Sequence, residues 1–198
     1  TLAPFGSCAI VKHASYTESA QVLAEIGWQK VDGIVLDLGV SSMQLDQAER
    51  GFSFQQNGPL DMRFDPTRGP SAADLVNNLD EKALADLIWR YGEERYSRRI
   101  ARAIVQARPL QTTQELATVV RSAIGKTSER QDPATRTFQA LRIAVNDELK
   151  NIQEALPQLI ELLESNARLA VISFHSLEDR IVKQIFQRES KDCICPPE

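Results

Sequence analysis

The chain has 198 residues, of which 42% are hydrophobic and 25% charged, and its formal net charge is −4. This length suits one sizeable domain, or one domain with an insertion. No apolar run approaches the roughly 20 residues that span a bilayer, and no secretory signal opens the chain, so a membrane protein is excluded and a cytoplasmic protein expected. The odd number of cysteines (Cys8, Cys193 and Cys195) does not suit a disulfide framework and indicates a reducing compartment.

The first part of the chain alternates between strand and helix patterns. Apolar residues predict a strand over residues 7–11, a helix over 17–26 and a second strand over 34–38. This alternation is typical of a parallel sheet. The second strand delivers Asp37 to a Gly/Ser loop, and ligands of open α/β sheets bind at that carboxyl edge. A ligand-binding Asp37 is therefore expected, with a loop-capping carboxylate as the alternative.

Residues 50–70 form an irregular segment that glycines and prolines interrupt. It also contains aromatic residues of the buried type, such as Phe52, beside dense charge, and a long loop of this kind is more often functional than idle. Within it, Asp61 and Arg63 are either a structural salt bridge or a pair that orients a substrate.

From residue 71 the apolar period becomes helical. Thr112 and Glu115 have capping-box spacing, and apolar residues from Phe138 to Leu156 predict one long helix that Pro157 stops or kinks. Residues 90–142 hold 11 Lys/Arg against 5 Asp/Glu, a local balance of +6 inside an acidic chain. Such a separation favours either a polyanion-binding face or a set of solvated helix faces.

The last part predicts a short helix over 159–164, a strand over 168–173 and a helix capped by Ser176. This strand, like the one at Asp37, ends in polar residues, so we expect the two strand ends to lie side by side. Phe174 could stack on a flat ring, or belong to the core. A Ser/His hydrolase using His175 is disfavoured because no G-x-S-x-G motif is present.

Other common sites lack their sequence signals. No phosphate-binding or dinucleotide-binding glycine motif occurs in these residues. Cys193 and Cys195 supply half of a zinc site at best, so no metal is predicted.

Several blocks of sequence resemble one family. They are VLDLGVSSMQLD (35–46), ERGFSF (49–54), GPLDMR (58–63), YGEER (91–95), RIARAIV (99–105), PATRTFQALRI (133–143) and ISFHSLEDRIVK (172–183). Together they are similar to the bacterial small-subunit ribosomal RNA (cytosine-N(4))-methyltransferase family, and they cover most of the chain.

The resemblance implies an α/β fold: a partial, Rossmann-like sheet that binds S-adenosylmethionine (SAM), with an inserted all-helical subdomain. Residues 1–68 and 141–198 would form the methyltransferase domain, and 69–140 the RNA-binding insertion. Asp37 and Gln44 match cofactor-binding residues of the family, and Tyr16 falls where the family usually has a Phe beside the cofactor. The implied substrate is a cytidine of the decoding centre, in small-subunit ribosomal RNA or the assembled subunit; a homodimer is a further candidate assembly.

The chemistry suggests roles for further residues. Acceptors aimed at the cytosine amine would localise its lone pair, and Asp61, Ser41 and Ser173 are the candidates. Phe174 would stack on the base. Phosphate contacts are expected from a set of arginines, with helix-to-loop salt bridges as the alternative for some: Arg95, Arg98, Arg99, Arg102, Arg136 and Arg142.

The sequence also departs from the family pattern. The glycine-rich cofactor loop would precede Thr1, so the chain is expected to be a fragment. Asp132 stands where a His is usual, and residues 164–167 replace the usual Pro-Gly-Gly turn. The absent loop motivates one alternative, a non-catalytic RNA-binding module; a DNA cytosine-N(4) methyltransferase is another.

Overall fold

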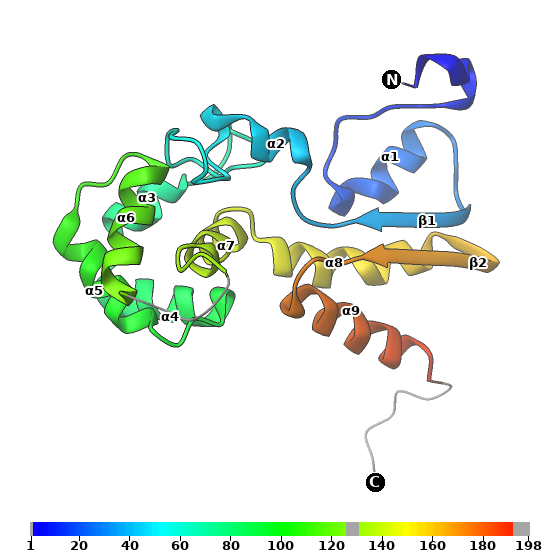
Figure 1. Cartoon of the computed structure of the whole chain (residues 1–198). Helices are drawn as coiled ribbons and strands as arrows, with labels where there is room; N and C mark the ends of the chain where they lie inside the picture. Colours follow the sequence, from blue (N-terminus) through cyan, green and yellow to red (C-terminus); the bar gives the residue numbers. More distant parts are fainter. Residues whose placement is uncertain (1, 126–130, 192–198) are drawn as a thin grey trace, which may run out of the picture. The chain divides into compact units, whose positions relative to one another are not determined.

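The computed structural model describes residues 2–125 and 131–191. It is a mixed α/β structure with a small parallel sheet and many helices, consistent with a Rossmann-like methyltransferase fold (Figure 1). The chain divides into two compact units. We call Thr1–Leu38 with Leu149–Glu198 the sheet unit, and Gly39–Glu148 the helical unit. Within the described residues, no helix is long and apolar enough to cross a membrane.

The sheet unit is built on two parallel strands. β1 (Val31–Asp37) pairs with β2 (Leu163–Ile172) so that Asp37 lies opposite Ile172. Successive side chains of a strand point to opposite faces. One face is buried against α8 (Glu148–Glu161) and α9 (Ser176–Glu189), where Leu36 packs with Ile152 and Ile185. The N-terminal part adds η1 (Ala3–Cys8), η2 (Tyr16–Glu18) and α1 (Ser19–Glu25).

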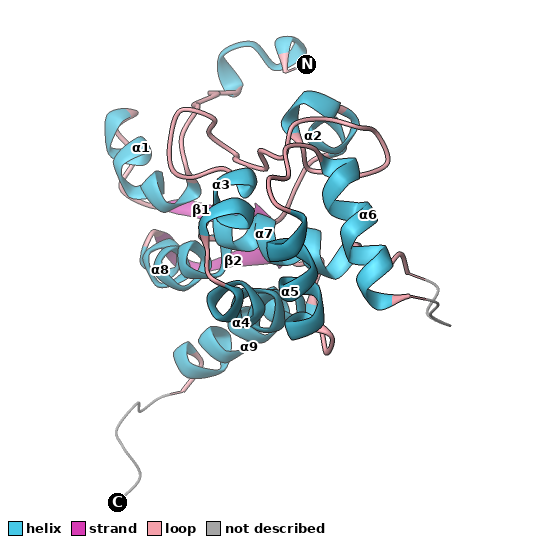
Figure 2. Cartoon of the chain, turned by 90° about the vertical axis from the view of Figure 1, so that its left-hand side faces the viewer, coloured by secondary structure: helices cyan, strands magenta, loops and turns pink. Residues whose placement is uncertain are grey.

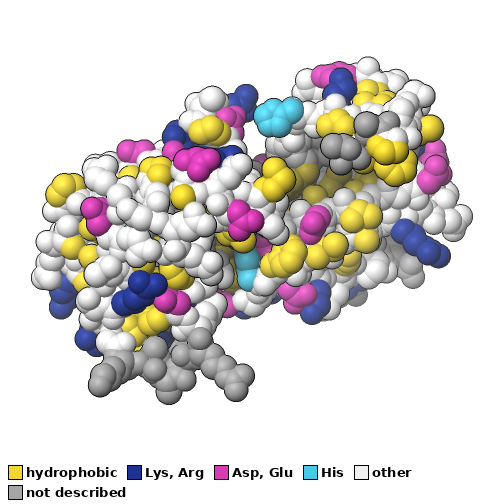
Figure 3. All heavy atoms as spheres, turned by 45° about the horizontal axis from the view of Figure 1, so that its top comes forward, with side chains coloured by type: hydrophobic (Ala, Val, Ile, Leu, Met, Phe, Trp, Pro, Cys, Tyr) yellow, Lys and Arg dark blue, Asp and Glu magenta, His cyan; other side chains and the backbone are white. Residues whose placement is uncertain are grey.

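The other face of this small sheet is open. Val35 is 73% exposed and Ile172 is 48% exposed, although both are apolar residues in strands. In the space-filling view, yellow apolar side chains are exposed on the part of the surface that belongs to the sheet unit (Figure 3). The sheet unit therefore buries one face of its strands and leaves the other to solvent.

The helical unit forms around its own apolar core. Its elements are α2 (Ser42–Asp46), η3 (Ala48–Arg50), α3 (Ala72–Asn78), α4 (Glu81–Gly92), α5 (Ser97–Ala107), α6 (Thr113–Ile124) and α7 (Thr135–Val145). α4 packs against both α5 and α7, and α5 also packs against α6 (Figure 2). Fully buried Leu84, Ile100 and Leu141 lie in this core. A Cβ added to Gly92 would lie 2.6 Å from the Arg136 carbonyl oxygen, so α4 and α7 approach closely at this glycine.

The irregular segment belongs to the helical unit. Phe52, Leu60 and Met62 are buried in its core, and Pro59 forms an isolated antiparallel bridge with Thr112. Asn146 fixes the segment further, because its amide donates to the Met62 carbonyl at 2.7 Å. The boundaries of the compact units therefore differ from the predicted 1–68, 69–140 and 141–198. The roles predicted for the two parts, methyltransferase domain and RNA-binding insertion, stay predictions.

Several predicted elements are corrected by the structure. Residues 7–11 contain the end of η1 and extended chain rather than a strand. The long helix predicted up to Pro157 divides into α7 and α8, because Asp147 has a positive φ of 50°, and Pro157 lies inside α8. β2 already begins at Leu163, within the segment predicted as a short helix.

Candidate functional site

The carboxyl ends of β1 and β2 meet at one edge of the sheet unit. The amide of Leu38 donates to the Ile172 carbonyl at 3.1 Å, so Asp37 and Ser173 leave the sheet at adjacent positions. The side chain of Asp37 is exposed, and none of the described residues bonds to its carboxylate. An exposed, unengaged carboxylate at this edge can accept hydrogen bonds from a ligand. The juxtaposition of the two strand ends is as the sequence predicted.

A local network holds the turn after β2. Glu178, which is 1% exposed, accepts a hydrogen bond from the Phe174 amide at 2.9 Å. His175, rather than the predicted Ser176, is the N-cap of α9: its Nδ1 accepts from the Glu178 amide at 3.4 Å. The Phe174 ring is 68% exposed. The imidazole is thus engaged as a cap, which gives the hydrolase alternative no support, while the phenyl ring is available for stacking.

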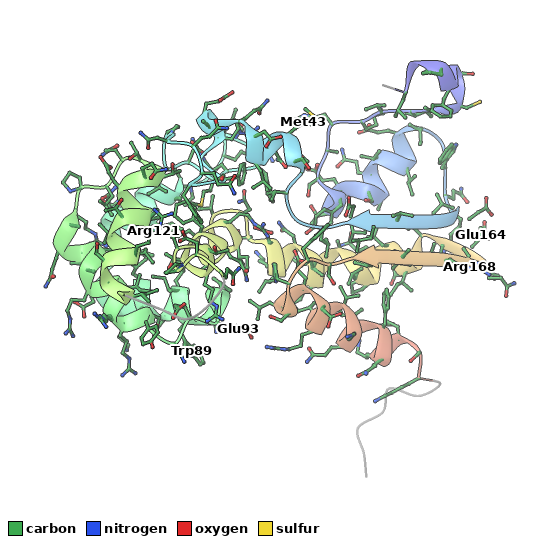
Figure 4. The ribbon with its side chains drawn as sticks, viewed as in Figure 1. Met43, Trp89, Glu93, Arg121, Glu164 and Arg168 are labelled. Atoms are coloured by element: carbon green, nitrogen blue, oxygen red, sulfur yellow. The ribbon has the colours of Figure 1, made fainter. Side chains whose placement is uncertain are left out.

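Ser41 and Gln44 form the capping box of α2. The Ser41 amide donates to Gln44 Oε1 at 2.9 Å, and the Gln44 amide donates to Ser41 Oγ at 3.3 Å. Met43, on the same short helix, is 72% exposed and is labelled in Figure 4. The capping box gives both polar side chains a structural function, although the Gln44 side-chain NH₂ still offers donors.

Tyr16 opens η2 in the sheet unit. It is half-buried and packs against the apolar core beside the strands. The capping box of Ser15 and Glu18 fixes the start of this short helix. Tyr16 is therefore held in the sheet unit, and its predicted contact with a cofactor stays a prediction.

Asp61 and Arg63 form a partly buried ion pair in the helical unit. Arg63 Nη2 donates to Asp61 Oδ2 at 2.7 Å and Nε donates to Oδ1 at 2.9 Å. These hydrogen bonds lower the pKa of Asp61 below its usual 3.8, against the opposing effect of burial. Asp61 is consequently ionised at neutral pH. It can accept hydrogen bonds, but a carboxylate of lowered pKa is a weak general base.

The predicted phosphate-binding arginines have different settings. Arg98 and Arg99 of α5 are exposed and form no hydrogen bond or ion pair with a described residue. Arg102, on the same helix, lies 3.3 Å from Glu81 in an exposed pair. The Arg95 guanidinium lies over the Tyr96 ring, 4.7 Å from its centroid. These four side chains are on the surface of the helical unit.

Arg136 and Arg142 are engaged more deeply. Arg136 Nη1 lies 3.8 Å from the buried carboxylate of Glu94. The Arg142 side chain is only 16% exposed, and its Nε lies 2.7 Å from the carboxylate of Glu148, which is 5% exposed. Arg142 therefore neutralises a buried acid within the helical unit, which matches the salt-bridge alternative for this residue.

The structure also shows features that were not predicted from the sequence. An open depression in the helical unit is lined by Glu94, Tyr96, Ile124, Gln131, Asp132, Pro133 and Arg136. Trp89 of α4 is 64% exposed. The sequence held a signal for Trp89, because it falls outside the apolar stripe of Leu84, Leu87, Ile88 and Tyr91.

Cys193 and Cys195 lie outside the described residues, so the prediction that they bind no metal remains untested.

The MraW methylase family matches residues 1–198. The chain belongs to this family. It is 56% identical over 97% of its length to "Ribosomal RNA small subunit methyltransferase H" of Dehalococcoides mccartyi and 58% identical over 90% to the protein of that name from Acinetobacter baumannii. A third such protein, from Syntrophotalea carbinolica, is 54% identical over 99% of the chain. The chain spans 55%, 58% and 64% of these relatives, respectively.

Asp132 stands at the position where the family usually has a His, and the structure shows what it contacts there. The Asp132 carboxylate accepts hydrogen bonds from Arg121 Nη2 at 2.8 Å and from Arg121 Nε at 3.0 Å. Partial burial raises the pKa of Asp132. The hydrogen bonds from Arg121 and from the Ala134 amide lower it by more, so the pKa lies below its usual 3.8. The same guanidinium lies over the Phe54 ring, 5.3 Å from its centroid. Asp132 thus ties α6 to the residues before α7.

Proposed function

We propose that the protein containing this chain transfers a methyl group from SAM to the exocyclic N4 amine of a cytidine in small-subunit ribosomal RNA. The observation that carries the proposal is the family match over residues 1–198, with relatives named as small-subunit ribosomal RNA methyltransferases. The exposed carboxylate at the sheet edge supports a ligand site there. The substrate RNA, free or in the assembled subunit, and a cytoplasmic location belong to the same proposal.

The residues at the edge of the sheet unit fit one part of the cofactor. SAM carries hydroxyl and ammonium donors, and Asp37 presents a carboxylate that no described residue engages. We assign Asp37 to those donors. We also assign Tyr16 and Gln44 to the cofactor, as the resemblance implies. Gln44 would contact it through its side-chain NH₂, because its Oε1 is engaged in the capping box. When bound, SAM supplies an electrophilic methyl group on a sulfonium.

The chain's own side chains would prepare the nucleophile. The N4 lone pair of cytosine is delocalised into the ring, so acceptors near the amine hydrogens would localise it. Once the methyl group is on N4, the amine would carry a positive charge and would have to lose one proton. Ser173 leaves the sheet beside Asp37 and is the acceptor best supported by position. Asp61 could hold the developing positive charge, whereas the proton itself would leave to water.

RNA contacts are assigned to the surface arginines of the helical unit. Arg98 and Arg99 are the strongest candidates because they are exposed and unpaired among described residues. Arg95, Arg102 and Arg136 would add contacts, and Phe174 of the sheet unit would stack on a base. Neutralising phosphates releases counterions, so affinity should fall as salt rises. A homodimer stays a prediction, which the molar mass from light scattering would test.

Two substitutions test the proposal in the complete protein of this reading frame. Asp37→Ala should abolish SAM binding in calorimetry while the circular dichroism spectrum is retained. Unchanged SAM affinity would remove Asp37 from the site. Asp61→Asn should leave SAM affinity intact and slow methyl incorporation, and Ser176→Ala serves as a matched control outside the assigned residues.

The choice of substrate is tested separately. Labelled methyl incorporation should appear in small ribosomal subunits or their RNA and not in cytosine-containing DNA. Incorporation into DNA alone would overturn the proposed substrate. Measurable RNA binding without any methyl transfer, even with SAM bound, would favour the non-catalytic alternative.

A further inference from the structure

The depression in the helical unit combines an aromatic ring, a cation and a buried carboxylate. Tyr96 is 37% exposed and lines the depression, and the Arg95 guanidinium lies over one face of its ring, 4.7 Å from the centroid. Arg136, with 36% of its side chain exposed, lines the same depression. These are the groups that hold unpaired nucleotides in proteins: a ring for the base and a cation for the phosphate.

Glu94 contacts both the backbone of Tyr96 and the side chain of Arg136. The carboxylate of Glu94 is 95% buried, accepts a hydrogen bond from the Tyr96 amide at 2.8 Å, and lies 3.8 Å from Arg136 Nη1. One side chain therefore positions both the backbone of the aromatic residue and the neighbouring cation. Because the backbone of Tyr96 is already fixed, the residue loses little conformational entropy when a base stacks on its ring, and this favours binding.

The size of the depression limits the ligand. It encloses about 290 Å³ including its open mouth. Much of this space is open to solvent, so the depression is a shallow hollow in the surface and not an enclosed ligand pocket. A ligand there would lie across the mouth of the hollow, as a base stacked on a surface ring does, and would not be enclosed.

The electrostatic surroundings favour RNA over other aromatic ligands. Arg98 and Arg99 lie in the first turn of α5, just after its N-cap Tyr96, and are exposed without a described partner. A chain of phosphates leading to or from the bound nucleotide could contact them. A double helix could not present a base to the ring, because its bases are stacked and paired.

We propose that this depression binds one unpaired nucleotide of the RNA substrate, with its base stacked on Tyr96 and its phosphate near Arg136. The proposal rests on the proposed function, since RNA as substrate is part of it. It adds a second contact point for the RNA, in the helical unit, and predicts that the RNA there is single-stranded.

The test measures binding of the 198-residue chain to a fluorescent, unstructured pyrimidine octaribonucleotide and to an RNA duplex with the same number of phosphates. Tyr96→Ala should weaken single-strand binding about 5- to 150-fold, as expected for the loss of one stacked base. Duplex binding and the slope of affinity against salt should not change. Tyr96→Phe keeps the ring and should retain affinity within about twofold.

Two further variants separate stacking from charge and from general exposure. Arg136→Gln should weaken binding and reduce the salt slope by roughly one phosphate contact. Trp89→Ala removes a more exposed aromatic side chain of the same unit outside the depression, and should leave affinity unchanged.

The outcomes distinguish this inference from the proposed function. If the chain binds RNA but Tyr96→Ala does not weaken it, or Trp89→Ala weakens it equally, the depression is not the nucleotide site, while the proposed function stands. If the chain binds neither RNA, the inference fails, and the SAM and methyl-transfer measurements on the complete protein decide the proposed function independently.

Discussion

The helical unit and the sheet unit are stabilised by different kinds of contact. In the helical unit, side chains cap the N-termini of α2, α3, α4 and α6, whereas α5 and α7 have no side-chain cap. The capping residues are Ser41, Ser71, Asp80 and Thr112. Its long irregular segment is anchored by buried side chains and by amide hydrogen bonds. In the sheet unit, two strands bury one apolar face and expose the other.

The difference reflects the range of the backbone hydrogen bonds. A helix satisfies its backbone within its own segment, whereas a strand needs neighbours, and a two-stranded sheet is marginal without packing on a face. The helical unit can therefore obtain most of its order from contacts within residues 39–148. Among the described residues, the core of the sheet unit is formed on one face of the strands by α8 and α9, with Tyr16 of η2 packed against it.

A large loss of stability is expected when the buried ion pair of the helical unit is broken. Arg142→Ala leaves the carboxylate of Glu148 without its guanidinium partner, and should lower the free energy of unfolding by about 3 kcal/mol. Arg98→Ala, an exposed arginine of the same unit, should change it by less than about 0.5 kcal/mol. Urea titration followed by circular dichroism measures both. Equal effects of the two variants would contradict the structural assignment of Arg142.

Replacing one glycine in each unit by alanine tests how tightly the backbone is packed there. Gly92→Ala places a Cβ 2.6 Å from the Arg136 carbonyl oxygen and 3.3 Å from the Ala140 Cβ, so α4 and α7 must separate. The expected loss is about 1–3 kcal/mol. In β1, a Cβ at Gly33 would meet the Arg168 carbonyl at 3.6 Å, an ordinary contact, and Gly33→Ala should be neutral or slightly stabilising. A tolerated Gly92→Ala would show that the helices are packed less tightly than described.

Local patterns predicted local features well. The capping box of Thr112 and Glu115 and the strand leading to Asp37 follow from short-range rules, and both are confirmed. The pairing of the strand ends at Asp37 and Ser173 was predictable because parallel strands end at one edge. The family, and with it the fold class, could be inferred from the sequence blocks.

Features that depend on tertiary packing were missed. Nothing in the spacing from Phe138 to Leu156 shows that Asp147 adopts a positive φ and ends the helix early. Nor does the charge count show that Arg142 is buried against Glu148 while Arg98 faces solvent. The depression at Tyr96 is lined by Glu94 and Tyr96 together with residues from Ile124 onward, which are distant in sequence, so no local pattern could predict it.

Acidification should weaken the helical unit through carboxylates that are engaged in the folded state. Arg63 lowers the pKa of Asp61, the Ser71 hydroxyl that of Asp74, and the Gln111 amide that of Glu115. A lowered folded-state pKa contributes stability that is present above the usual values of 3.8 and 4.5 and is lost as pH falls through the lowered values. Unfolding free energy should therefore decline below about pH 4.5. Arg63→Gln should make this decline shallower, and an unchanged pH profile would exclude Asp61 as a contributor.

The smallest expected effect concerns the open face of the sheet. Val35 is 73% exposed, so Val35→Thr keeps the β-branched shape, removes little buried apolar area, and should change the free energy of unfolding by less than about 0.5 kcal/mol. Leu36, its neighbour on the buried face, is 7% exposed, and Leu36→Ala should lose about 2–5 kcal/mol. If Val35→Thr instead destabilised the chain by more than about 1.5 kcal/mol, apolar contacts would have to cover this face in solution. The sheet unit would then resemble the helical unit in burying both sides of its framework.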